Sequence, residues 1–260
     1  MSKQIVYSCY ANRTREGEQF VPVHVFSYQI AGSITFNDGK TAHVCDEGAL
    51  TFIRRNHLLK FLKQPPENGE AKTISVYLEE ETLRDFSLEY GYASDKQVEG
   101  PVVTMLKPDP LYKSYMQSLQ PYDRLSESGN DDLLKLKLKE AILILLKVNP
   151  ELKNVLFDFS EPGKIDLEAF MLKNFQFNVA IKRFAYLTGR SLATFKRDFE
   201  KIFHTSPSRW LQQKRLQEAY YLIKEKGRKT SDVYLEVGFE DLSHFSFAFK
   251  KAYGVAPSAL

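Results

Sequence analysis

Only two cysteines, Cys9 and Cys45, occur among the 260 residues. Two cysteines are too few for the disulfide framework of a small secreted protein or for a zinc site built from cysteines. No apolar run approaches the roughly 20 residues of a membrane span, and the N-terminus has no apolar signal segment. We therefore expect a cytoplasmic protein that does not enter the membrane, with both thiols buried and inert rather than forming a redox switch.

The residue sets of common catalytic sites are absent as well. The sequence has no glycine-rich phosphate loop, no CxxC pair and no recognisable Ser/His/Asp set. A metal site in a small β-barrel needs clustered imidazoles and carboxylates, usually with a His-x-His pair. Here His24, His43 and His57 are scattered. We predict no catalytic residues, no metal, no cofactor and no enzymatic activity.

Charge is distributed unevenly along the chain. Residues 165–260 hold 16 of the 36 basic and 10 of the 33 acidic residues, a net charge of +6, which leaves the rest of the chain at −3. A basic domain joined to an acidic one suggests that only the C-terminal part meets a polyanion. We predict a regulatory and dimerisation domain over 1–160 and a second domain over 165–260, with a linker near Phe157–Lys164.

The first domain is predicted to begin with a small β-barrel or sandwich over about 20–80. Short apolar runs at intervals of 8–12 residues, with Asn37-Asp38-Gly39 as a tight hairpin, support this assignment. The predicted strands lie at Val21–Ile30, Ile34–Phe36, Ala42–Cys45, Leu50–Ile53, Leu58–Leu62 and Thr73–Leu78.

Helices are predicted over about 81–150, at Glu81–Tyr90, Pro110–Leu119 and Asp131–Val148. The last is apolar almost all round, which requires burial on most sides. It is either an interdomain core helix or a helix shared across a homodimer, and both readings remain open. For the dimer interface we select the residues at helical spacing, Leu134, Leu138, Ala141 and Leu145.

The C-terminal domain is predicted to be helical throughout, and one pattern occurs in it twice. Each copy is a helix, a glycine turn and a capped second helix, at about 179–203 and 230–253. Gly189 and Gly238 suit the left-handed residue that ends the first helix. Ser191 and Asp241 are good N-caps for the second. Five residues recur fifty positions later, namely Ser191, Phe195, Phe199, Lys201 and Pro207 as Asp241, Phe245, Phe249, Lys251 and Pro257.

Each second helix is predicted to have an apolar face and a polar face. The apolar faces are Leu192, Phe195, Phe199 and Ile202 in one copy, and Leu242, Phe245, Phe249 and Ala252 in the other. Small and long polar side chains on the opposite face suit the major groove of DNA. A helix over about 208–226 separates the copies and spans ~28 Å, near the ~34 Å between successive major-groove turns. A helical bundle that merely packs would not need this duplication, so we predict a sequence-specific DNA-binding protein.

The residues Gly238-Phe239-Glu240-Asp241-Leu242-Ser243-His244-Phe245-Ser246, with Phe249-Lys250-Lys251-Ala252-Tyr253-Gly254 and Pro257-Ser258, resemble the DNA-binding domain of the AraC/XylS family of transcription regulators. The resemblance covers essentially all of 165–260. It implies two helix-turn-helix subdomains joined by a long helix, binding double-stranded promoter DNA, with RNA polymerase as a partner and activation as the usual effect. The family's base-contact positions map onto Ala193, Lys196, Arg197, Ser243, Ser246 and Phe247. Phe247 departs from the family pattern, in which a polar or basic residue is common.

Phosphate contacts are predicted for further polar and basic residues of the same domain. These are Ser191, Lys201, Arg209, Lys214, Lys250 and Lys251. His204 stands where the family commonly has glycine after the first recognition helix, and histidine tolerates the left-handed conformation better than a branched residue does.

The N-terminal half is more loosely similar to the family's regulatory domains, which are cupin-like β-barrels followed by dimerising helices. Glu47–Arg55 and Ile74–Glu81 resemble the branch that contains activators of type III secretion. That resemblance implies control by a protein partner, whereas the sugar-responsive branch binds a small molecule, so the effector belongs to either class. The alternatives are a ligand-binding or metal-dependent cupin enzyme with a DNA-binding tail, and an architectural DNA binder. The latter would need no separate acidic domain.

Overall fold

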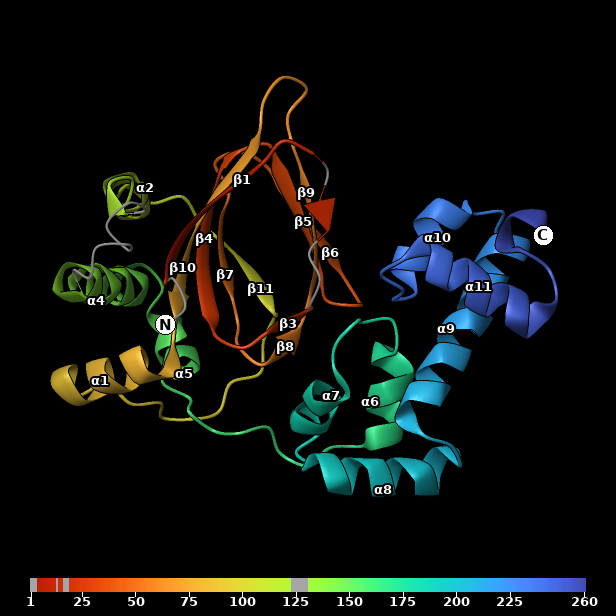
Figure 1. The fold of residues 1–260 in the computed structure, drawn as a ribbon. Coiled ribbons are helices and arrows are strands. Elements are labelled where there is room, and N and C mark those ends of the chain that lie inside the picture. Colours follow the sequence, from red (N-terminus) through yellow and green to blue (C-terminus); the bar gives the residue numbers. More distant parts are fainter. Residues whose placement is uncertain (1–3, 13, 16–18, 123–130) are drawn as a thin grey trace. The chain divides into compact units, whose positions relative to one another are not determined.

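The chain folds into two compact units, and the computed structural model describes residues 4–12, 14–15, 19–122 and 131–260 (Figure 1). The first unit holds most of the chain up to Ser160. The second begins at Glu161 and also includes the short segments that contain Phe20 and Leu58. The protein is thus α+β, with a sheet-rich N-terminal unit and a helical C-terminal unit, as the sequence predicted at this coarse level.

Antiparallel strands form two main sheets in the first unit. A five-stranded sheet has the order β1-β10-β4-β7-β11, a four-stranded sheet has the order β2-β9-β5-β6, and β3 pairs with β8. The bounds are β1 Ile5–Tyr10, β2 Thr14–Arg15, β3 Phe20–Val21, β4 His24–Ala31, β5 Ser33–Asn37, β6 Ala42–Cys45, β7 Leu50–Ile53, β8 His57–Leu58, β9 Lys60–Gln64, β10 Ala71–Leu78 and β11 Val103–Leu106.

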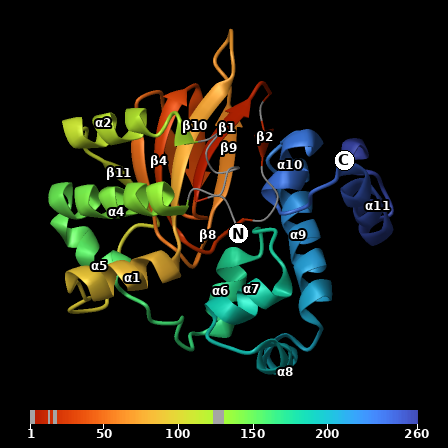
Figure 2. The same cartoon turned by 60° about the vertical axis from the view of Figure 1, so that its left-hand side comes forward.

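Helices cover one face of the five-stranded sheet (Figure 2). They are α1 Glu80–Tyr90, α2 Pro110–Ser118, α4 Asp131–Val148, the 3₁₀ turn η1 Pro150–Leu152 and α5 Lys153–Leu156. Alternate residues of β4 and β7, such as Phe26 and Phe52, point into a core completed by Phe86 of α1, Tyr112 of α2 and Leu145 of α4. The intervening positions of the sheet bear buried polar residues, among them Ser27, Gln29, Thr51, Thr73 and Ser75.

Sequence patterns located most of these elements and missed others. β1 and β11, the edge strands of the five-stranded sheet, were not predicted. Each is a short segment far from the main run of strands, and it forms a strand because it pairs with β10 or β7. The prediction of two buried thiols is wrong for Cys9, which is exposed on β1, while Cys45 is buried.

The second unit consists of helices around two hydrophobic cores. The helices are α6 Leu167–Asn174, α7 Ile181–Leu187, α8 Leu192–Phe203, α9 Pro207–Lys224, α10 Thr230–Glu236 and α11 Leu242–Tyr253, followed by the 3₁₀ turn η2 Pro257–Ala259. The first core gathers residues of α6, α7, α8 and the beginning of α9. The second gathers residues of the rest of α9, α10 and α11. The unit therefore contains two subdomains that share one long helix.

Candidate DNA-binding surface

The first helix-turn-helix is formed by α7 and α8. Thr188, fully buried, closes α7 by donating its hydroxyl to the Phe184 and Ala185 carbonyl oxygens. Gly189 follows with φ +64°, and a Cβ there would lie 2.5 Å from the Gly163 oxygen, so the turn requires glycine. The Ser191 hydroxyl then accepts a hydrogen bond from the Thr194 N–H at 3.2 Å. The predicted glycine turn and N-cap are both confirmed.

The second helix-turn-helix, α10 and α11, repeats this design. Gly238 has φ +101°, and the Asp241 carboxylate accepts from the His244 N–H at 2.6 Å. Gly254 ends α11 in the left-handed conformation. In the first copy His204 holds the corresponding position with φ +52°, as expected for a residue that tolerates that region.

Aromatic side chains anchor each second helix to its core. Phe195 and Phe199 of α8 are fully buried, and Phe199 packs edge-on against Trp210 of α9. In α11 the equivalent residues Phe245 and Phe249 are fully buried. The predicted apolar faces were too long, because Leu192, Ile202, Leu242 and Ala252 are exposed. All four lie in the first or last turns of their helices, beyond the reach of the core.

The faces opposite these anchors are open to solvent. Of the residues predicted to contact bases, Ala193, Lys196, Arg197, Ser243 and Phe247 are exposed, and Ser246 is partly buried. The Arg197 guanidinium lies 3.6 Å from the Asp198 carboxylate, with most of its side chain in solvent. Phe247 is 70% exposed, although Phe245 and Phe249 beside it are fully buried. The ring of Phe247 is therefore available for an apolar contact.

The residues predicted to contact phosphates lie on the same two subdomains. Ser191, Lys201, Arg209, Lys250 and Lys251 are exposed. Lys214 is partly buried, with its ammonium 5.8 Å from the centre of the Phe175 ring. Helix α9, which lies between α8 and α11 in the chain, has 18 residues, a length of ~27 Å at 1.5 Å per residue. That length is close to the spacing of successive major grooves.

The α4 residues predicted for a dimer interface lie on the side of the helix that faces the core of the first unit. Leu138, Ala141 and Leu145 are buried in the first unit's own core, and Leu134 packs against it. These side chains face the sheet because α4 covers it, so they offer no surface to a second copy. The leucines that α4 leaves exposed are Leu133, Leu136 and Leu143.

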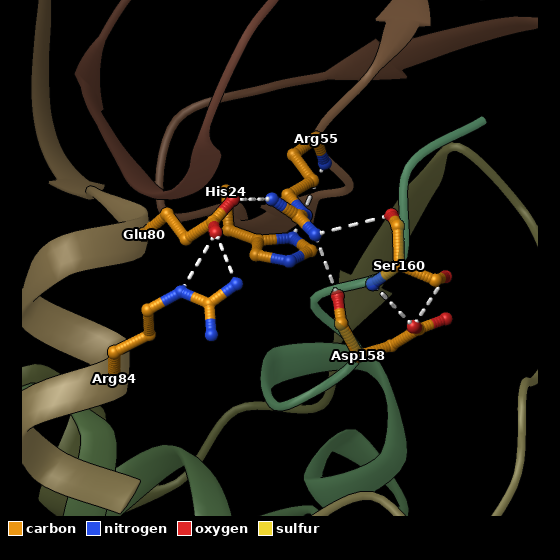
Figure 3. A network of polar contacts seen from close by, with 6 residues as sticks. All are labelled: His24, Arg55, Glu80, Arg84, Asp158 and Ser160. Carbon is orange, nitrogen blue, oxygen red and sulfur yellow. Dashed lines mark hydrogen bonds and ion pairs between the residues drawn. The ribbon is translucent and has the colours of Figure 1, made fainter. Parts of the chain in front are cut away.

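A polar network in the first unit involves an arginine that the sequence patterns did not identify (Figure 3). The Arg55 guanidinium pairs with Glu80 of α1 and donates to the Asp158 carbonyl oxygen at 2.7 Å. It also reaches the Ser160 carbonyl oxygen at 3.5 Å. Arg55 therefore fixes the last residues of the first unit, immediately before the second unit begins at Glu161.

Next to Arg55 lies a buried histidine. The His24 Nδ1 accepts a hydrogen bond from the Arg55 backbone N–H at 3.2 Å, which leaves the ring proton on Nε2. Nε2 has no hydrogen-bond partner among the described residues, and the ring stacks on Phe52. Burial, followed by the charges of Arg55 and Arg54, lowers the pKa of His24 to about 3. His24 is therefore neutral at physiological pH.

The described residues lack two further features. No helix in that part of the chain is long and apolar enough to cross a membrane. Within the same residues, no three His, Cys, Asp or Glu side chains gather as a metal would require.

Two family models match the chain. A helix-turn-helix domain of the AraC type matches residues 184–260, and the ExsA N-terminal regulatory domain matches residues 24–155, more than half of the chain. The chain is 24% identical over 236 residues to the HTH-type transcriptional regulator ExsA of Pseudomonas aeruginosa, covering 88% of this chain and 82% of that protein. It is 22% identical over 237 residues to the virulence regulon transcriptional activator VirF of Yersinia enterocolitica, covering 88% and 85%.

Solved structures also resemble the chain. The crystal structure of ToxT from Vibrio cholerae, in the apo form of a lysine-to-alanine variant, aligns with a TM-score of 0.47 at 12% identity, over 99% of this chain and 97% of that one. An AraC-type DNA-binding protein of Chromobacterium violaceum aligns at 24% identity with a TM-score of 0.33, over 36% of this chain and 83% of that one. The two matched families and the relatives ExsA and VirF are transcription regulators, which are not enzymes.

Proposed function

Because the chain belongs to the AraC/XylS family of DNA-binding transcription regulators, in the branch with an ExsA-type regulatory domain, we propose that α8 and α11 read bases in two successive major grooves of a promoter. The observation that carries this proposal is the pair of capped helices with buried aromatic anchors and open polar faces. Ala193, Lys196 and Arg197 read one groove, and Ser243, Ser246 and Phe247 read the other. The exposed phenyl ring of Phe247 suits apolar contact with a thymine methyl group.

Phosphate contacts hold the two helices in place. Ser191, Lys201, Arg209, Lys250 and Lys251 are exposed on the two subdomains, and phosphate contacts of this kind fix register without reading sequence. Lys214 joins them from α9 by leaving the ring of Phe175. Each neutralised phosphate should add about −0.9 to the slope of log affinity against log salt. DNA binding of this chain should therefore weaken steeply with salt.

Binding of the protein to a promoter activates transcription by RNA polymerase bound to the same promoter. The protein acts in the cytoplasm. VirF, which is similar to this chain along most of its length, is described as a transcriptional activator. We infer that the two sheets of the first unit correspond to the cupin-like barrel expected of the family's regulatory domains. An effector, either a protein partner or a small molecule, acts on that unit. The position of Arg55, which joins α1 to the last residues of the unit, supports transmission of such a signal toward residue 161.

Dimerisation occurs through the exposed face of α4. Leu136 is 61% exposed and Leu143 39% exposed, and a spacing of seven residues brings them to the same side of the helix. Together with Leu133 they form an apolar stripe of the kind that packs against a second helix. Two copies joined here would present four recognition helices to the promoter.

Genome-wide footprinting of the tagged full-length protein tests the proposal. We expect a limited set of protected promoters that share two short motifs, and reduced protection when Lys196 and Arg197 are both replaced by alanine. Uniform, sequence-independent protection would show an architectural binder instead. If neither the unaltered protein nor the double alanine variant protects any site on the DNA although both are folded, the proposal is wrong.

A further inference from the structure

The two helix-turn-helix subdomains have separate hydrophobic cores, and α9 contributes to both. Leu211 and Trp210, toward its N-terminus, pack with the first core. Leu216 and Ala219 pack with the second. Arg215 lies between these two groups. An apolar interface therefore holds each subdomain to α9, and the contacts near Arg215 lie at the junction of the two.

The guanidinium of Arg215 donates hydrogen bonds to backbone carbonyl oxygens on both sides of this junction. Its Nε donates to the Phe175 carbonyl oxygen at 2.8 Å, and Nη2 donates to the Phe177 carbonyl oxygen at 2.8 Å. Both acceptors belong to the loop between α6 and α7, in the first subdomain. Its Nη1 donates to the Gly238 carbonyl oxygen at 3.0 Å, which is in the turn between α10 and α11. One side chain thus joins the first subdomain to the turn that precedes the second recognition helix.

The planar guanidinium of an arginine suits simultaneous hydrogen bonding to these three carbonyl oxygens. The three acceptors are fixed in the backbone, and a guanidinium presents its donors in rigid directions, whereas an ammonium is a point charge on a flexible stem. Burial lowers the pKa of Arg215 to about 10, with Glu240 opposing that shift. The side chain is therefore charged at neutral pH, and hydrogen bonds from a charged donor are stronger than those between neutral groups.

Gly238 supplies a second, independent observation at the same junction. A Cβ on this residue would lie 2.8 Å from the Gln176 carbonyl oxygen and 2.9 Å from the Arg215 Nε. The turn of the second subdomain thus approaches the loop of the first too closely for any side chain. Nearby, Asn178 of that loop donates its side-chain amide to the Glu240 carboxylate. Loop, turn and α9 form one tightly fitted joint.

We propose that Arg215 is a positioning residue that locks the two recognition helices at one separation and angle, so that the protein accepts its two DNA motifs at only one spacing. The inference rests on the proposed function. Inserting one base pair moves a motif by ~3.4 Å along the DNA axis and ~35° around it. If the two subdomains are held rigidly, they cannot shift by that amount, and one recognition helix no longer contacts its motif. If the contacts at Arg215 are weakened, the subdomains can shift and both motifs remain bound.

The test is selection from a randomised DNA duplex pool by the full-length protein, followed by sequencing. The unaltered protein enriches two motifs at one fixed spacing. Arg215→Lys keeps the charge but lacks the planar guanidinium that donates to three fixed carbonyl oxygens at once, so it enriches the same two motifs over a range of spacings. In titrations, a one-base-pair insertion should cost the unaltered protein on the order of 10-fold or more in affinity, and cost Arg215→Lys far less.

A matched pair of glycine variants makes the test independent of whether the arginine variant folds. Gly238→Ala intrudes on the joint, whereas Gly227→Ala places a Cβ at another left-handed glycine with nothing within 4 Å. Gly238→Ala should widen the range of spacings between the two enriched motifs, and Gly227→Ala should leave the single spacing unchanged. The inference is overturned if Arg215→Lys and Gly238→Ala retain the single spacing, or if the unaltered protein enriches only one motif. If the unaltered protein enriches no motif at all, the proposed function itself fails.

Discussion

The ring of Phe199 in α8 meets the indole of Trp210 in α9 at an interplanar angle of 80°, with 5.6 Å between the ring centroids. Phe199 also lies 4.4 Å from Phe203 and 5.6 Å from Phe195, measured between centroids. This aromatic cluster connects the first recognition helix to the helix shared by both subdomains. The orientation of α8, whose exposed face we propose to read bases, therefore depends on a side chain buried on its opposite face.

Phe199→Ala should unfold the first subdomain or nearly so. Removing a fully buried phenylalanine typically costs ~3–5 kcal/mol, a large part of the stability of a small domain. Phe247→Ala is the matched control, because the same side chain is removed from an exposed site, where the expected change is within ~0.5 kcal/mol. Thermal melts of both variants decide the matter. Equal melting temperatures would contradict the assignment of Phe199 to the core.

The recurrence that predicted these roles was informative because it combined several constraints. Turn glycine, N-cap and two aromatic anchors each have a strict local requirement, so their repetition at Asp241, Phe245 and Phe249 was recognisable without a structure. The family assignment made from them is confirmed by the family matches. The residues that join segments distant in sequence gave no such signal. Arg215 donates to three backbone carbonyl oxygens, and Arg55 donates to two besides its ion pair with Glu80. Backbone acceptors leave no sequence pattern.

The choice of face on α4 shows a second limit of sequence patterns. The helix is apolar almost all round, so periodicity could not tell which side packs on the sheet. The helical spacing favours Leu138 and Leu145 for a dimer interface, yet both lie in the core, whereas Leu136 and Leu143 are exposed. The side of α4 that packs on the sheet depends on the sheet formed by β1, β10, β4, β7 and β11. The pairing of these strands is long-range in sequence, so the pattern of α4 alone does not reveal it.

Leu136→Lys combined with Leu143→Lys should convert a dimer into a monomer without lowering the melting temperature of the first unit. The charges would be buried at the apolar seam of a dimer but solvated in a monomer. Leu88→Lys is the control, since Leu88 is 85% exposed on α1. Sedimentation at tens of micromolar measures the outcome. A double variant that remains dimeric would exclude this face of α4.

The first unit should lose stability as the pH falls below about 6.5. Folded His24 has its pKa lowered to about 3, so between these values the unfolded chain binds a proton that the folded chain does not. The free energy of unfolding therefore decreases with falling pH, by up to ~1.4 kcal/mol per pH unit from this group. Burial also lowers the pKa of His57, which adds in the same direction.

His24→Asn isolates this contribution. The asparagine side-chain oxygen can still accept from the Arg55 N–H but does not titrate in this range. Urea unfolding of the full chain at a series of pH values should give a shallower dependence for the variant, even where its stability is lower throughout. Parallel curves for the two proteins would show that His24 does not cause the acid sensitivity.

Arg55→Met should release the segment that contains Asp158 and Ser160. The arginine satisfies the carbonyl oxygens of both residues, and without it hydrogen exchange and proteolysis should increase there. Arg54→Met is the control, because Arg54 donates to the Val98 carbonyl oxygen instead. Exchange measured by mass spectrometry on the full chain distinguishes the two variants. Unchanged protection at residues 157–160 in Arg55→Met would show that other contacts hold the segment.

The last prediction separates base reading from phosphate binding, and it compares Arg197 in α8 with Lys250 in α11. Arg197 is exposed one turn and a half into the recognition helix, opposite the buried Phe195 and Phe199. From there an arginine can donate two hydrogen bonds to guanine N7 and O6, which is worth ~1–3 kcal/mol of discrimination against another base. Arg197→Ala should therefore weaken binding to a selected promoter site far more than to a scrambled duplex.

Lys250 is exposed in the last turn of α11, past the residues that we assign to bases, and its ammonium suits a phosphate. Lys250→Ala should weaken binding to both duplexes alike and flatten the salt dependence by about one unit of slope. Titration of each variant against both duplexes at several salt concentrations gives the two readouts together, with thermal melts to verify folding. Equal losses on both duplexes for Arg197→Ala would refute base reading by α8, because a phosphate contact cannot distinguish a promoter from its scrambled counterpart.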